Sequence, residues 1–255
     1  MSGNTQSAAP PAPTYRDVLR REGGTVWYAA MGLIRTPVAM APLALVFLGH
    51  STGSFSAGGV MAAAHALGEA VGAPFMGRGF DRKPFLGQLR FALLAEALAF
   101  AALAVLAGHS PMPLLVALAF AAGAVAAGVP GGMRAQLSST TPEHLRPTAL
   151  GLESALNQAV WACGPVLASL VSTQVSPRVA LVLMAVASAA PLLMAGRIRH
   201  RSPVAGERDR APAGTLSVIR MAWPTVLLAA AIMFLVGAMD VACRPAWRRP
   251  GSSSR

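Results

Sequence analysis

The chain has 255 residues, of which 54% are apolar and only 12% are charged. A soluble domain carries about 25% charged residues, so this composition excludes a soluble globule and predicts an integral membrane protein. The formal net charge of +11 is spread between apolar runs instead of gathered in one patch, which argues against a nucleic-acid-binding protein.

The N-terminal part predicts a disordered segment followed by a transmembrane helix. Residues 1–24 are expected to form a disordered and basic cytoplasmic N-terminus, in which residues 1–13 are rich in Ser, Ala and Pro and residues 15–22 are a basic lead-in. The apolar run over residues 25–48 follows. At 1.5 Å per residue it reaches about 36 Å, enough to cross a hydrocarbon core of about 30 Å. It is also longer than the core of a signal peptide, which has about 7–15 residues.

Similar apolar runs recur along the chain and predict further transmembrane helices. They cover residues 55–76, 89–108, 112–133, 148–173, 179–196 and 222–242. Thr141-Pro142-Glu143, a hydroxyl residue followed by proline, predicts a short interfacial helix before residue 148. We therefore expect an all-α membrane protein with a six-helix bundle over residues 25–196, a basic linker over 197–221 and a seventh helix over 222–242.

Basic residues in the loops predict the orientation. The N-terminal lead-in, residues 77–90, residues 134–147 and the linker all contain Arg, whereas the loops on the opposite side contain only Arg178. Lys and Arg are retained on the cytoplasmic side, so the N-terminus is expected in the cytoplasm. The preference for Arg over Lys, with abundant Ala, is typical of a bacterial protein, and we expect a multi-pass protein of the inner membrane.

The segment after the seventh helix departs from this rule. Residues 243–255 contain four Arg that would lie outside the cell, at positions 244, 248, 249 and 255. Two interpretations remain open, a small protein with a basic outer tail and a product of truncation or frameshift near Ala242. We favour the second, because an intact carrier would continue with apolar runs.

The turn between the second and third predicted helices carries a motif. Gly77-Arg78-Gly79-Phe80-Asp81-Arg82-Lys83 contains the spacing Gly-x-x-x-Asp-Arg. This spacing resembles the loop signature between the second and third helices of major facilitator superfamily transporters. In that family two six-helix halves enclose a substrate site near the membrane midplane. The resemblance implies that the chain corresponds to the first half plus the first helix of the second.

The resemblance also assigns roles within this loop. It implies that Gly77 permits close packing, that Asp81 accepts hydrogen bonds at a helix end, and that Arg82 and Lys83 pair with acids or lipid phosphates. Together they would hold the cytoplasmic helix ends in one conformation and release them in another. Pro84 departs from the family pattern, which has glycine there. Gly164-Pro165 is similar to an element of drug/proton antiporters, although its flanking glycines are missing.

Charged residues within the predicted helices are candidates for the transport site. Gly-x-x-charged recurs at Gly32 to Arg35 and Gly237 to Asp240, which the family's pseudo-symmetry would bring to related positions. A charge at mid-membrane costs about 2.5–3.5 kcal/mol on insertion scales, so it normally faces a cavity or a partner. Arg35 would bind an anionic group or pair with a coupling carboxylate, or alternatively form a structural ion pair.

Further acids in the predicted helices are Glu69, Glu96 and Glu153. A proton-coupled carrier needs a carboxylate that alternates between wet and dry surroundings. Glu69 lies one turn from His65, and Glu153, Asn157 and Trp161 recur on one helix face. The alternative for each is a hydrogen bond between helices. We rank Asp240 and Glu153 first, followed by Asn157 and Glu69.

The leading functional prediction is a secondary transporter that moves a small solute by alternating access, with efflux coupled to protons as a finer expectation. The alternative is a non-transporting membrane fragment or interaction protein. An enzyme is not expected, because the predicted helices do not bring a cluster of catalytic side chains to the same depth in the membrane. No cofactor or metal is expected either, since Cys163 and Cys243 lack ligand spacing. The expected partners are the bilayer, a small solute and protons, with a homodimer or a missing C-terminal half completing the carrier.

Overall fold

The structure is a computed structural model of the whole chain, and it describes residues 14–21, 23–194 and 196, together with Trp223, Leu227 and Ala231. The chain divides into two units, Met1–Pro203 and Val204–Arg255. The expectations for the linker and the basic tail lie outside the described residues, and so does Asp240. Of the expected seventh helix only Trp223, Leu227 and Ala231 are described, each in helical conformation.

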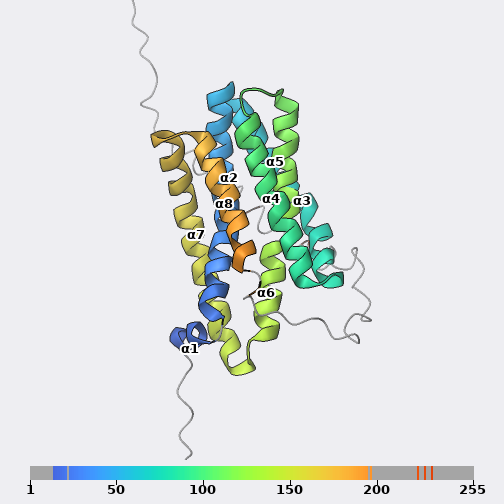
Figure 1. Cartoon of the computed structure of the whole chain (residues 1–255), viewed down its shortest axis with the longest axis vertical. Coiled ribbons are helices and arrows are strands. Elements are labelled where there is room, and N and C mark those ends of the chain that lie inside the picture. The colour runs from blue at the N-terminus through green and yellow to red at the C-terminus, as the bar shows by residue number, and fades with distance from the viewer. Residues whose placement is uncertain are drawn as a thin grey trace, which may run out of the picture. The chain divides into compact units, whose positions relative to one another are not determined.

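The described part of the first unit is a bundle of helices without a β-strand, which confirms the all-α class (Figure 1). In chain order the helices are α1 (Tyr15–Arg20), α2 (Gly24–Thr52), α3 (Phe55–Arg82), α4 (Phe85–Leu106), α5 (Met112–Ala126), α6 (Val129–Thr140), the 3-10 helix η1 (Glu143–Leu145), α7 (Arg146–Gln174) and α8 (Pro177–Met194). The expected interfacial helix at Thr141-Pro142-Glu143 corresponds to η1. The long helices alternate in direction, as their short connections require (Figure 1).

Five stretches of the described residues are long and apolar enough to cross a membrane. They are Gly24–Thr52, Phe85–Leu106, Met112–Thr140, Glu143–Gln174 and Pro177–Met194. The expected second span, α3, has 28 residues but does not reach the same hydropathy. It carries His65, Glu69 and a charged C-terminal end. In chain order it connects α2 to α4.

The prediction of a loop over residues 77–83 is wrong. α3 continues through Arg82, and the Lys83 N–H donates to the Gly79 carbonyl oxygen at 2.9 Å. Lys83 and Pro84 alone separate α3 from α4. A residue before proline is biased away from helical angles, and Lys83 is extended at φ −104° and ψ 161°. Proline, and not the glycines, therefore ends the helix.

Glycines let α3 and α5 approach each other closely. A Cβ atom added at Gly68 or Gly72 of α3 would collide with the α5 backbone at Phe120 or Ala124. A Cβ atom added at Gly123 of α5 would likewise collide with the backbone carbonyl group of His65 on α3. The pattern Gly68-x-x-x-Gly72 therefore serves close packing of α3 on α5.

We predict that Gly72→Ala lowers the stability of the bundle, because its methyl group must push α5 away from α3. Overpacking of this kind costs about 1–3 kcal/mol. Gly59→Ala on the same helix is the matched control, since no atom lies within 4 Å of its Cβ position. The measurement is the thermal unfolding midpoint in detergent. Equal midpoints for the two variants would contradict the close packing.

A second prediction concerns α1, outside the membrane-spanning segments. The Thr14 hydroxyl and N–H donate to Asp17 Oδ2 at 2.7 Å and 2.8 Å, and these bonds lower the pKa of Asp17 below its ordinary value of 3.8. A lowered folded-state pKa stabilises α1 above the ordinary value, and this contribution disappears as the pH falls through the lowered pKa. The protection of the α1 amides, measured as the exchange rate relative to the intrinsic rate at each pH, should therefore fall in acid in the wild type. In Asp17→Asn the exchange should show no such additional acid dependence.

Candidate functional site

The contact between α2 and α7 positions the most informative polar residue of the chain. Arg35 lies well inside α2, which continues as one helix through Pro37 and Pro42. The Tyr28 hydroxyl donates to the Ala149 carbonyl oxygen at 3.0 Å, and Gly164 of α7 leaves room for Ala39 of α2. These contacts on either side of Arg35 fix the register of α2 against α7.

Arg35 meets two of the other predicted site residues at this contact. Its guanidinium group forms an ion pair with Glu153 and donates a hydrogen bond to Asn157 Oδ1. The Arg35 side chain is 12% exposed and that of Glu153 is 1% exposed. The spacing of Glu153 and Asn157, one turn apart on α7, is what allows both to reach a single guanidinium group. Trp161, the next residue of the predicted stripe, is exposed.

A second arginine, which the sequence places in a loop, also lies close to Glu153. Arg134 on α6 places Nη1 3.6 Å from Glu153 Oε2. No sequence signal pairs these two residues, because they come together only through the packing of α6 beside α7. We call Arg35, Arg134, Glu153 and Asn157 the arginine–glutamate cluster.

The arginine–glutamate cluster carries two positive charges and one negative charge. Within the described residues, Arg35 Nε and Glu153 Oε2 have no hydrogen-bond partner. The cluster therefore has spare donor capacity and an excess positive charge, and it can bind an acceptor or an anion.

Glu69 belongs to a different polar group in the bundle. His65 Nδ1 lies 3.7 Å from Glu69 Oε1, and the His65 ring stacks on Phe100 of α4 at a centroid distance of 5.9 Å. Glu96, one turn before Phe100, is 1% exposed, and neither of its oxygens has a hydrogen-bond partner among the described residues. The Ser188 hydroxyl on α8 faces this carboxyl but donates to the Met184 carbonyl oxygen at 3.1 Å.

The residues of the motif Gly77 to Lys83 lie at the C-terminal end of α3. Asp81, Arg82 and Lys83 are exposed and form no ion pair within the described part of the chain. A Cβ atom at Gly77 would meet nothing within 4 Å there, so the expected close packing through Gly77 itself is not found. Instead Gly128 permits the approach, because its Cβ position lies 2.9 Å from the Gly77 nitrogen.

No group of His, Cys, Asp and Glu side chains suited to a metal ion occurs among residues 14–21, 23–194 and 196. The arginine–glutamate cluster itself offers an ion pair and a hydrogen bond between the side chains described above.

We predict that Glu153→Gln destabilises the bundle by about 3–5 kcal/mol, because it leaves a buried arginine without its counter-charge. Arg35→Gln should have a similar effect, and the double variant should lose less than the sum of the two. Glu96→Gln is the control, since this equally buried acid forms no ion pair in the described residues. The measurement is a double-mutant cycle of unfolding free energies in detergent. Additive losses would contradict coupling between the two side chains.

Comparison with known proteins gives the family of the chain. No curated protein matches it, and no solved structure matches it. A family model described as the Major Facilitator Superfamily matches residues 28–247, a range that includes the whole arginine–glutamate cluster. The match covers most of the chain and agrees with the resemblance at Gly77 to Lys83, with the all-α bundle and with its apolar helices. The chain belongs to the Major Facilitator Superfamily, and it is a multi-pass membrane protein of a transporter family.

Proposed function

We propose that the chain is a secondary active transporter that moves a small solute across the cytoplasmic membrane by alternating access, outward in exchange for protons. The arginine–glutamate cluster is the observation that supports this proposal. Glu153 is 1% exposed and is approached by two arginines from different helices. Charged groups in membrane helices are costly, and they commonly mark substrate or ion pathways.

In this proposal Arg35 binds an acceptor group of the solute and Glu153 carries the proton. When Glu153 is charged, it occupies Arg35 together with Asn157. Protonation of Glu153 removes the counter-charge and leaves Arg35 free for the solute. Solute and proton thus act through one guanidinium group, which links their binding.

Asp81, Arg82 and Lys83 are the proposed conformational contacts at the cytoplasmic end. Their exposure and their lack of ion pairs in the described residues leave them available for partners elsewhere. Asp240, which lies outside the described residues, is the proposed second acid of the transport site. We place the N-terminus in the cytoplasm and the protein in the inner membrane, on the basis of the distribution of basic residues.

The proposed cavity needs a second wall. In the family the site lies between two helix bundles. A second copy of this chain or a separate C-terminal half would supply that wall. A non-transporting membrane fragment is the alternative, and it becomes the conclusion if no such complex transports.

The test is proton-coupled flux in liposomes that contain the purified protein and a pH-sensitive dye, with a panel of small organic anions as probes. Arg35→Ala should lower flux more than about tenfold, because a hydrogen bond to a charged group contributes about 1.5–3 kcal/mol. Glu153→Gln should bind the anion but lose proton coupling. Arg90→Ala, which removes an exposed positive charge outside the cluster, is the control.

Flux that is equal in wild type and Arg35→Ala would contradict the assignment of Arg35. Absence of flux for every probe, with intact protein in the liposomes and after addition of the C-terminal half, would favour the non-transporting fragment.

A further inference from the structure

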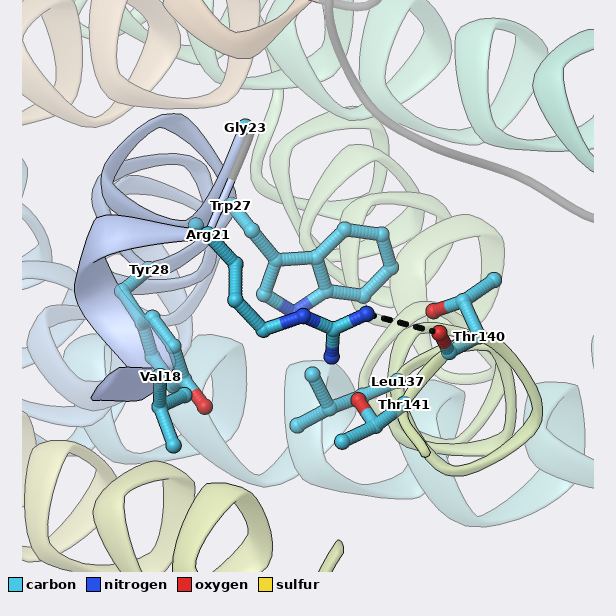
Figure 2. A pocket seen from close by; sticks show the side chains of 9 residues that line it. Val18, Arg21, Gly23, Trp27, Tyr28, Leu137, Thr140 and Thr141 are labelled. Atoms are coloured by element: carbon cyan, nitrogen blue, oxygen red, sulfur yellow. Dashed lines mark hydrogen bonds between the residues drawn. The ribbon is translucent and has the colours of Figure 1, made fainter. Parts of the chain in front are cut away.

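A small cavity lies at the N-terminal end of α2, and no member of the arginine–glutamate cluster is among its described lining residues (Figure 2). It is enclosed by α1, the turn after α1, the start of α2 and the end of α6. Its lining residues are Val18, Arg21, Gly23, Gly24, Trp27, Tyr28, Leu137, Thr140 and Thr141. Its volume of about 40 Å³ exceeds the roughly 10–15 Å³ that one water molecule needs.

Two side chains that can only donate hydrogen bonds line this cavity. Trp27 is 4% exposed, and its indole Nε1 has no hydrogen-bond partner among the described residues. Arg21 makes one long hydrogen bond, from Nη2 to the Thr140 carbonyl oxygen at 3.4 Å (Figure 2). Neither side chain has an acceptor atom, so a ligand placed between them must supply one.

The other polar side chains around the cavity do not provide a negatively charged acceptor for these two donors. The Tyr28 hydroxyl donates to the Ala149 carbonyl oxygen, and the Thr140 hydroxyl donates to the Gln136 carbonyl oxygen at 2.8 Å. None of the lining residues that the structure describes is acidic. The Asp17 carboxylate on α1 is bound to Thr14.

The backbone adds further positive potential. The cavity lies at the first turn of α2, a helix of 29 residues whose N-terminus carries a partial positive charge. The turn before it is held tight by two glycines. Gly23 has a φ of 76°, and a Cβ atom at Gly24 would lie 2.5 Å from the Val18 carbonyl oxygen. This tight turn holds α1 and Arg21 over the N-terminus of α2.

We propose that this cavity, the Arg21–Trp27 pocket, binds a phosphate group, and that the phosphate of an acidic membrane lipid is its occupant. The buried indole N–H, the guanidinium group and the helix N-terminus together suit an anion with several acceptor oxygens. Acidic lipids bring such a group to the membrane surface, where the first turn of α2 emerges. This site is separate from the proposed solute site and does not depend on transport.

The test uses the full-length protein in neutral detergent and measures ligand binding by native mass spectrometry. The probes are phosphatidylglycerol, diacylglycerol, which lacks phosphate, and inorganic phosphate. Wild-type protein should bind phosphatidylglycerol in preference to diacylglycerol. Arg21→Gln should weaken that binding roughly tenfold, as expected for the loss of a charge-assisted hydrogen bond. Trp27→Phe should weaken it severalfold, because it removes the N–H and keeps an aromatic ring.

Two matched controls separate this site from general effects. Arg20→Gln removes the same charge from an exposed neighbour that does not line the pocket, and Trp161→Phe makes the same aromatic change at an exposed position. Both should bind as the wild type does. Binding of inorganic phosphate, but not of phosphatidylglycerol, with the same dependence on Arg21 and Trp27 would identify free phosphate as the source of the group.

Equal binding of phosphatidylglycerol and of phosphate by the wild type, Arg21→Gln and Trp27→Phe would overturn the proposal. If Arg21→Gln fails to fold, Trp27→Phe decides the question, because the conservative change leaves the tight glycine turn and the guanidinium group in place.

Discussion

The ion pair between Arg35 and Glu153 is the interaction on which the α2–α7 contact depends. A hydrocarbon environment offers neither side chain a water shell, so each needs the other to remain charged. Tyr28 and Gly164 hold the two helices together on either side of the pair. The geometry leaves the pair asymmetric, because Arg134 adds a second positive charge at 3.6 Å while no second acid joins it within the described residues.

Polar residues inside the bundle form two groups with different surroundings. The arginine–glutamate cluster retains partly exposed members, whereas Glu96 is enclosed by α4 and its neighbours with no hydrogen-bond partner for its oxygens in the described part. His65 and Glu69 lie at the close contact of α3 with α5, where Gly123 admits the α3 backbone. The three glutamates thus occupy unequal environments: Glu153 has arginine partners, Glu69 has His65, and Glu96 has no hydrogen-bond partner among the described residues.

Hydropathy predicted the helices well, because a run of apolar residues long enough to cross a bilayer has few other structures available. The arginine–glutamate pairing was partly predictable, since Glu153 and Asn157 recur on one helix face. The contact of Arg134 with Glu153 was not predictable, because α6 and α7 share no sequence pattern and only their packing brings the two side chains together. The motif at Gly77 to Lys83 was assigned to a loop, but glycine only weakens a helix, and Pro84 was the effective stop. Asp240 lies outside the described residues, so its role stays a prediction.

The modest hydropathy of α3 affects how the bundle is made. During synthesis α3 leaves the ribosome before α5, the helix whose glycine contact covers its polar face. Until α4 and α5 arrive, His65 lacks both the Phe100 ring on which it stacks and the neighbouring backbone of Gly123. On its own, α3 is less hydropathic than the five stretches named above. Insertion of α3 therefore has to be completed together with α4 and α5, so that the biogenesis of this bundle depends on three helices entering the bilayer as one unit.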